Sequence, residues 1–243
     1  MNRLQLLLLP GLLSDAFVWR AQCRDLAAQA DVQVADYRDC DSIEAMAQRV
    51  LAAAPPEFAL VGHSMGGRVA LEIQRVAGRR IRAIALMDTA TAPRAEGEEV
   101  KRMRLVNLGF ESGMAAVARE WLPPMVHPSR HADERFMADL GDMVRRFTPV
   151  QFAGQIRALL GRPDATPVLA MISCPALVLC GRQDAWRSPE QHREMAQKIS
   201  GAEFVMVEEC GHMAPVERPG PVTAALRALL DRHDAVGPAS AGR

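Results

Sequence analysis

Short, mostly apolar runs alternate along the chain with longer segments whose apolar residues recur every three or four positions. Such runs are typical of strands buried on both faces, and the longer segments are typical of amphipathic helices. Alternating strands and helices predict an α/β fold with a doubly wound, mostly parallel sheet. Strands are expected within residues 4–10, 31–39, 57–64, 80–88, 174–185 and 202–210, and helices over 17–30, 42–54, 65–78, 188–199 and 219–233.

The alternation stops between residues 91 and 170. This segment holds helical patterns rich in Met and Arg and has no convincing strand. Ligands of parallel sheets bind at the carboxyl ends of the strands, so a helical cap inserted between core strands is expected over that edge. The predicted organisation is a core of residues 1–90 and 171–233, a cap of residues 91–170, and a disordered tail of residues 234–243.

Four residues mark the expected helix ends. Ser42 and Ser188 are N-cap candidates, and Pro189 suits a first helical position. Gly78 could close the helix that begins near residue 65.

Composition excludes several classes of function. The chain has 243 residues and a formal net charge of zero, with 29 basic and 29 acidic residues. A neutral chain argues against binding to nucleic acid or through a polybasic membrane anchor. No segment approaches the roughly 20 apolar residues of a membrane span. Five scattered cysteines without a CxxC pair favour a reduced, cytoplasmic setting.

The N-terminal leucine run allows two interpretations. Arg3 followed by "LQLLLL" resembles a short signal peptide, and the same residues suit a buried parallel strand ended by Pro10-Gly11. The strand is favoured because a helical pattern follows at once, with no cleavage site of the A-x-A kind.

"GHSMG", residues 62–66, matches G-x-S-x-G between a strand pattern and a helix pattern. A strand that turns directly into a helix strains the turn residue and brings backbone segments close, which Gly62 and Gly66 would permit. Ser64 could merely cap the helix. Glycine on both sides favours instead a nucleophile held above the sheet.

A serine nucleophile needs a base, and the base needs an orienting group. Asp184 follows the strand "ALVLCG", and His212 follows the strand "FVMV". Both positions lie at the edge of the sheet where Ser64 is expected. The order Ser64, Asp184, His212 therefore predicts a serine-based active site.

With these motifs the sequence resembles the α/β-hydrolase superfamily, in its capped, single-domain esterase type (carboxylesterase-like). The resemblance rests on "VGHSMGG", "LVLCGRQDAW", "EECGHMAPVERP" and "LLLLPGLLSDAFVW" and extends to about residue 232. It implies that Ser64 is the nucleophile, His212 the general base and then acid, and Asp184 the orienting carboxylate. It further implies an oxyanion hole from the backbone N–H groups of Met65 and Leu12.

Two features depart from the family pattern. Pro10 replaces the usual His of the oxyanion loop, and the two leading edge strands are not evident. Asp88, also just past a strand, is a rival acid; Asp184 is favoured because its loop has the family's G-x-x-D form.

Substrate contacts are predicted for His63, Trp121, Met125 and Met213. His63 could equally be a wall residue behind the nucleophile. Methionines and aromatic residues of the cap could line an acyl pocket or pack the lid: Met103, Met114, Met137, Met143, Phe110 and Phe136. Arg145 and Arg146 could meet an anionic carrier, although a solvated face is favoured.

The remaining histidines suggest no chemistry. His127 and His131 have a metal-binding spacing, but Pro128 between them favours an exposed loop, and no metal site is predicted. His192 and His233 are expected on helix surfaces.

The resemblance implies a serine hydrolase that cleaves a carboxylic ester of a small or medium acyl substrate through an acyl-enzyme. Thioester cleavage, acyl transfer and C–C bond hydrolysis use the same triad and remain open. A non-catalytic module that binds a small ligand is less favoured because all three triad residues are present. No cofactor is required. The expected partner is a small ester; an acyl-carrier protein is possible without direct support.

Overall fold

The six predicted strands form one parallel sheet. The computed structural model describes residues 3–236. Its strands are β1 (Leu4–Leu9), β2 (Ala30–Val34), β3 (Phe58–His63), β4 (Ile81–Met87), β5 (Ala176–Gly181) and β6 (Glu203–Val207). They are ordered β2-β1-β3-β4-β5-β6, and all neighbours pair in parallel. The predicted fold class is confirmed, and the leucine run is β1 in the interior of the sheet.

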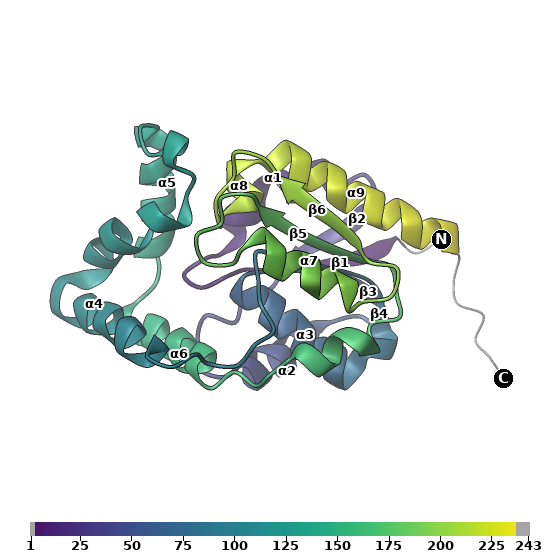
Figure 1. The fold of residues 1–243 in the computed structure, drawn as a ribbon, viewed down its shortest axis with the longest axis horizontal. Helices are drawn as coiled ribbons and strands as arrows, with labels where there is room; N and C mark the ends of the chain where they lie inside the picture. Colours follow the sequence, from purple (N-terminus) through teal and green to yellow (C-terminus); the bar gives the residue numbers. More distant parts are fainter. Residues whose placement is uncertain (1–2, 237–243) are drawn as a thin grey trace.

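Helices cover both faces because the strand order reverses at β1. The chain steps from β1 to β2 in one direction and from β2 to β6 in the other, and right-handed crossovers place the two sets of helices on opposite faces. α1 (Arg20–Leu26) packs with α9 (Pro219–Val236), whereas α2 (Ile43–Ala53) packs with α3 (Met65–Ala77). α7 (Pro189–Gln197) packs on β5 and β6. Figure 1 shows the sheet between these layers.

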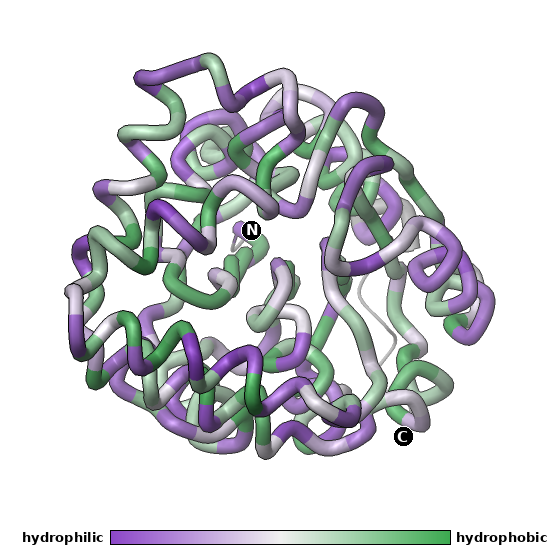
Figure 2. Tube along the Cα trace, turned by 60° about the vertical axis from the view of Figure 1, so that its left-hand side comes forward, coloured by the Kyte–Doolittle hydropathy of each residue, from purple (hydrophilic) through white to green (hydrophobic). Residues whose placement is uncertain are grey.

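The strand sequences reflect their places in the sheet. β3 and β5 are buried throughout, whereas the edge strands β2 and β6 keep partly exposed positions. In the tube coloured by hydropathy, the outer helices alternate between hydrophilic and hydrophobic residues (Figure 2). Apolar burial against the sheet therefore fixes which face of each helix points inward.

Most predicted helix ends are observed. The Ser42 hydroxyl accepts from the Ala45 amide at 3.1 Å, and Ser188 forms a capping box with Gln191 at the start of α7. Gly78 is different: α3 ends at Ala77, and Gly78 begins a 3-10 turn (Gly78–Arg80) at φ −54°. It continues the right-handed path into β4 and is not a left-handed cap.

The segment between β4 and β5 is helical, as predicted, and its described residues hold no strand. It contains α4 (Glu98–Trp121), α5 (Glu134–Arg145) and α6 (Pro149–Leu160), with 3-10 turns at Pro123–Met125, Pro128–Arg130 and Thr166–Met171. A residue with φ 76° and ψ 169°, Gly113, breaks α4 into two parts. Figure 1 shows α4, α5 and α6 together at one end of the molecule. We call residues 91–170 the helical insertion.

The remaining connections are short. A 3-10 turn (Ala16–Trp19) precedes α1, and a four-residue helix, α8 (Ala214–Glu217), precedes α9. The first predicted helix is shorter than expected because β2 already begins at Ala30. α9 runs through Val236, and residues 237–243 of the predicted tail lie outside the described residues. No helix in the described part of the chain is both long and apolar enough to cross a membrane.

Two glycines let three backbone segments meet at the start of α3. A Cβ on Gly66 would lie 2.6 Å from the carbonyl carbon of Leu9 and would overlap its oxygen. A Cβ on Gly62 would lie 2.6 Å from the carbonyl carbon of Gly66. The ends of β1 and β3 can approach the first turn of α3 this closely only without side chains at these positions.

We expect Gly66→Ala to lower the free energy of unfolding by about 1–3 kcal/mol or more, because the added methyl group meets rigid backbone. Gly220→Ala is the matched control, since a Cβ there meets nothing within 4 Å. Urea unfolding of both variants checks this. Equal stability of Gly66→Ala and the native chain would contradict the close approach.

Candidate active site

Ser64 occupies a strained corner between β3 and α3. Its backbone has φ 54° and ψ −115°, a conformation that non-glycine residues rarely adopt. Its side chain makes no capping hydrogen bond to the helix. The alternative that Ser64 is an ordinary N-cap is therefore wrong, because its hydroxyl points away from the first turn of α3 and has another partner.

Neighbouring strands hold this corner in place. The Ser64 amide donates to the Met87 carbonyl at 2.8 Å. The Ser64 carbonyl accepts from the Gly67 amide at 3.0 Å and from the Thr89 hydroxyl at 2.7 Å. Strain at a single residue persists only where surrounding contacts determine the backbone. Two of these three hydrogen bonds come from Met87, at the end of β4, and from Thr89, just beyond it.

Ser64, His212 and Asp184 form a continuous line of hydrogen bonds. Ser64 Oγ lies 2.8 Å from His212 Nε2, and His212 Nδ1 lies 2.8 Å from Asp184 Oδ2. With the hydroxyl donating to Nε2, the Nδ1–H of His212 donates to the carboxylate. The three residues come from the ends of β3, β5 and β6, as the parallel topology requires.

Asp184 is held as an anion. Burial raises the pKa of a carboxyl group, but here His212 and two backbone amides more than offset it and the net pKa is lowered. Those amides belong to Trp186, at 2.8 Å from Oδ1, and to Arg187, at 3.1 Å. A buried carboxylate with these partners suits the orientation and stabilisation of a protonated histidine.

Asp88, the rival acid, has a different environment. Its side chain is fully buried, and its Oδ1 accepts from the Gly181 amide at 2.9 Å. Burial, together with Asp184 and Glu217, raises its pKa well above the ordinary value, which keeps the group neutral. Its Oδ2 has no hydrogen-bond partner and lies 3.6 Å from His63 Nε2.

His63 is a wall residue behind the base. Its side chain is 1% exposed, and its Nε2 donates to the His212 carbonyl at 2.7 Å. Burial, reinforced by His212, lowers the pKa of His63 to about 3, so the ring is neutral. It packs edge-on against Trp19.

Glu217 and the helical insertion shape the loop that carries His212. The buried Glu217 carboxylate accepts from the amides of Gly211 at 3.1 Å, Met213 at 3.0 Å and His127 at 2.7 Å. The His212 amide donates to the Met125 carbonyl at 2.8 Å. The loop is therefore anchored on one side to the core and on the other to the insertion.

The turn after β1 lies across the site from His212. Leu12, Ser64 and Met65 line one pocket, and the Met65 amide, at the first position of α3, has no partner within its helix. The neighbouring Leu13 amide donates to Gln155 Oε1 at 3.0 Å. The Tyr37 hydroxyl donates to the Pro10 carbonyl, so this turn is braced even though Pro10 replaces the usual histidine.

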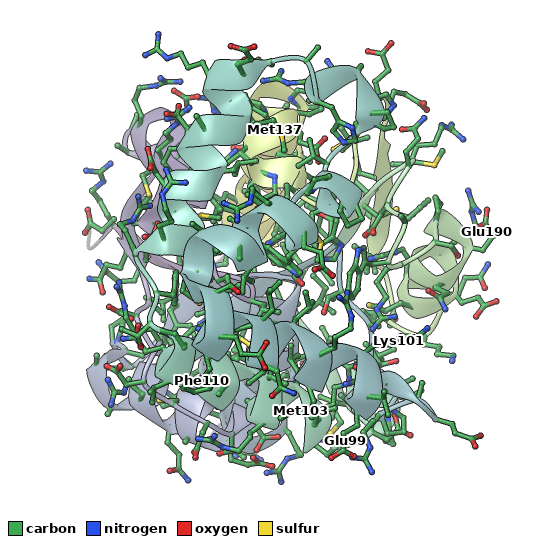
Figure 3. The ribbon with its side chains drawn as sticks, turned by 90° about the vertical axis from the view of Figure 1, so that its left-hand side faces the viewer. Glu99, Lys101, Met103, Phe110, Met137 and Glu190 are labelled. Carbon is green, nitrogen blue, oxygen red and sulfur yellow. The ribbon has the colours of Figure 1, made fainter. Side chains whose placement is uncertain are left out.

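The pocket above Ser64 has a volume of about 50 Å³. Of the predicted substrate contacts, Trp121 and Met125 line it, whereas His63 and Met213 are buried and are not among the lining residues. The other apolar residues of the insertion differ in exposure. Met114, Met143 and Phe136 are buried in the core, whereas Met103 and Phe110 are exposed on α4 (Figure 3).

Several residues of the site were not predicted. Four arginines line the pocket: Arg68, Arg102, Arg162 and Arg187. The arginines belong to none of the quoted motifs, so only the folded insertion and loops reveal them. Glu217 lies within "EECGHMAPVERP", but its role in holding the loop of His212 becomes evident only from its hydrogen bonds. Arg145 and Arg146, which were considered as carrier contacts, pair instead with Asp142 and Asp15.

The expectation that His192 lies on a helix surface is wrong. Its ring is fully buried, accepts from the Thr89 amide at 3.0 Å through Nε2, and donates to the Ser188 carbonyl at 3.0 Å through Nδ1. Burial lowers its pKa, as this neutral tautomer requires. His192 thereby ties α7 to the residue that holds Ser64. His233 is half-buried.

His127 and His131 lie around a 3-10 turn, where His127 Nδ1 is 2.8 Å from Ser129 Oγ. Within residues 3–236, no group of three or more His, Cys, Asp and Glu side chains is arranged to hold a metal ion.

Several known proteins resemble this chain in sequence. The alpha/beta hydrolase family matches residues 6–226. A pimeloyl-[acyl-carrier protein] methyl ester esterase of Neisseria meningitidis is 27% identical over 199 residues, which are 80% of this chain and 76% of that protein. The matched segments span between 62% and 76% of the length of three curated relatives.

Two solved structures resemble the whole chain. A thermophilic esterase from Thermogutta terrifontis, with malate bound, has a TM-score of 0.87 and 28% identity, covering 96% of this chain and 91% of that one. The enol-lactonase from Burkholderia xenovorans LB400 has a TM-score of 0.86 and 25% identity, with 95% and 92% covered. The predicted general class, an ester-acting hydrolase, is confirmed at that level. The chain belongs to the alpha/beta hydrolase family.

Proposed function

We propose that this protein hydrolyses a carboxylic ester of a small or medium acyl substrate through an acyl-enzyme on Ser64. The observation that carries the proposal is the line of two 2.8 Å hydrogen bonds from Ser64 through His212 to Asp184, beside a pocket of about 50 Å³. The relatives and solved structures named above include esterases, which supports the same class of reaction.

In the first half of the reaction, His212 Nε2 takes the proton of the Ser64 hydroxyl as Oγ attacks the ester carbonyl carbon. Asp184 stabilises the imidazolium that forms. The amides of Met65 and Leu12 are the proposed donors to the tetrahedral oxyanion, at the positive N-terminus of α3. His212 then returns the proton to the leaving alcohol.

In the second half, water attacks the acyl group on Ser64 while His212 takes its proton. The second tetrahedral intermediate collapses, the acid leaves, and Ser64 regains its hydrogen from His212. The hydrogen bond from His63 to the His212 carbonyl keeps the base in place through both steps. We further propose that the helical insertion acts as a cap, because Met125 joins it directly to the loop of the base.

An ester is favoured over a thioester or a C–C bond because two of the similar proteins described above are named as esterases. One relative is named as acting on a methyl ester carried by an acyl-carrier protein. A carrier partner for this chain has no further support, since Arg145 and Arg146 already have acidic partners. The cytoplasmic setting rests on cysteine usage, and all five cysteines are free.

Replacement of the nucleophile is the first test. Ser64→Ala should lower kcat/KM for p-nitrophenyl acetate by at least about 10³-fold, because no other hydroxyl within residues 3–236 is bonded to His212. Intact mass after fluorophosphonate treatment should show one adduct on the native chain and none on this variant. Ser129→Ala, which removes an exposed hydroxyl bonded to His127, should keep both the adduct and the activity.

A folded native chain that takes no adduct and cleaves no ester would overturn the proposal and would favour a module that only binds a ligand. Circular dichroism of Ser64→Ala separates loss of chemistry from loss of fold.

The two buried acids should respond differently to the same change. Asp184→Asn should lower kcat by about 10³–10⁴-fold, because an amide cannot stabilise protonated His212. Asp88→Asn should change kcat by less than about tenfold, because the Asp88 carboxyl is already neutral and an amide oxygen can still accept from Gly181. Steady-state kinetics with p-nitrophenyl acetate measures both. The reverse order of effects would assign the acid to Asp88.

A further inference from the structure

The pocket at Ser64 concentrates positive charge. Arg68, Arg102, Arg162 and Arg187 all line it, and the only acidic lining residue is Asp88. Burial, together with Asp184 and Glu217, raises the pKa of Asp88 well above its ordinary value, which favours its neutral form. Within residues 3–236, the one carboxylate paired with these arginines is Glu98, which bonds both Arg102 and Arg162 and does not itself line the pocket. Four guanidinium groups thus share one ionised partner in a mostly buried space.

This arrangement is costly without an anion in the pocket. Burial, together with the nearby charges of Arg162 and Arg187, lowers the pKa of Arg68 to about 9. The pKa values of Arg102 and Arg187 are also lowered, first by burial. Buried charges without partners are unfavourable, so a cluster of like charges beside a reactive serine requires a functional explanation.

Two of the four arginines bond backbone carbonyls through both of their terminal nitrogens. Arg68 donates to the Thr91 carbonyl at 2.7 Å and to the Ala92 carbonyl at 2.6 Å. Arg162 donates to Glu98 and to three backbone carbonyls, including Leu159 at 2.6 Å. These two side chains hold the loop after β4 and the end of α6 in place.

The other two keep donors to spare. The side chain of Arg187 donates one hydrogen bond, to the Trp186 carbonyl at 3.0 Å. No carboxylate in residues 3–236 lies within ion-pair distance of its guanidinium group. Arg102 uses Nε for Glu98 at 2.7 Å, which leaves its two terminal nitrogens without a bond to the described residues. A guanidinium fork with free terminal N–H groups matches the two oxygens of a carboxylate.

Both arginines also line a second cavity next to the pocket. This adjoining cleft has a volume of about 430 Å³ and shares Arg102, Arg187, Leu12, Trp121 and Trp186 with the pocket. The cleft also contains Lys101 and Arg104 and the acidic residues Glu96, Glu98 and Glu120, and Arg104 pairs with Glu120. Figure 3 shows Lys101 on the part of α4 nearer to α7 and Phe110 farther along. Three acidic side chains offset most of the positive charge in the cleft, whereas Asp88 is the one acidic residue among those that line the pocket, so we place the anion in the pocket.

We propose that Arg102 and Arg187 bind a carboxylate of the substrate, so that the ester cleaved at Ser64 is an acidic one, such as a monoester of a dicarboxylic acid. This rests on the proposed esterase function and adds its substrate class. The apolar side chains of Leu12, Trp121 and Met125 complete a pocket for a short chain with one charged end. Arg187 belongs to the loop whose backbone amides bind Asp184, so one loop positions both the proposed carboxylate-binding side chain and the acid beside His212.

Monomethyl and dimethyl glutarate provide a matched pair of substrates that differ in one charge. The native chain should have the higher kcat/KM for the monomethyl ester. Arg187→Gln should lower the ratio of the two kcat/KM values by about 10- to 100-fold, the effect of losing one hydrogen bond between charged groups, mainly through KM for the monoester. Arg187→Lys should restore part of the ratio, and Arg102→Gln should lower it as well.

Arg145→Gln is the matched control, because it removes an equal charge from an exposed residue of the insertion that pairs with Asp142. It should leave the ratio within about twofold of the native value. Inhibition of each variant by glutarate and by inorganic phosphate adds a readout of anion binding that does not depend on turnover.

The outcomes are distinct. Hydrolysis of the neutral diester without preference for the monoester would overturn the substrate class alone, as would a ratio unchanged in Arg187→Gln and Arg102→Gln. Stronger inhibition by phosphate than by glutarate would assign the pocket to a phosphate group instead. No turnover of either ester, with no fluorophosphonate adduct, would overturn the proposed function and this inference together.

Discussion

The backbone strain at Ser64 is the constraint on which the rest of the site depends. A residue at φ 54° and ψ −115° needs support from several directions. The parallel sheet supplies it, because Met87 and Thr89 follow from β4 and Gly66 packs against the end of β1. The order β2-β1-β3-β4-β5-β6 therefore positions the nucleophile as well as forming a core. His192 extends this support to α7 by fixing the Thr89 amide.

Two buried carboxyl groups that follow neighbouring strands have pKa values shifted in opposite directions by their surroundings. Asp184 lies beside His212, which lowers its pKa, whereas burial raises the pKa of Asp88 well above the ordinary value. Each favours the state of the other, since two adjacent buried anions would repel. His63 fits the same scheme: as a neutral ring it donates to the His212 carbonyl without adding charge beneath the base.

Sequence patterns predict the parts of this protein that local rules determine. All six strands, the caps at Ser42 and Ser188, and the meeting of Ser64, Asp184 and His212 follow from periodicity, turn chemistry and the geometry of parallel sheets. The burial of His192 could not be predicted, because its polar neighbours on α7 give no sign of the Thr89 amide. Arg68, Arg102, Arg162 and Arg187 come together only once the insertion has folded, since they are far apart along the chain.

The helical insertion contacts both the loop of His212 and the lining of the pocket. Its Met125 carbonyl holds the His212 amide, and its His127 amide shares the Glu217 carboxylate with the same loop. The positive charge of the pocket comes from Arg102 and Arg162 of the insertion and from Arg68 and Arg187 of the core. A movement of the insertion would therefore shift the base and the charge cluster together. That coupling limits how far the insertion can open to admit substrate without disturbing the Ser64–His212 hydrogen bond.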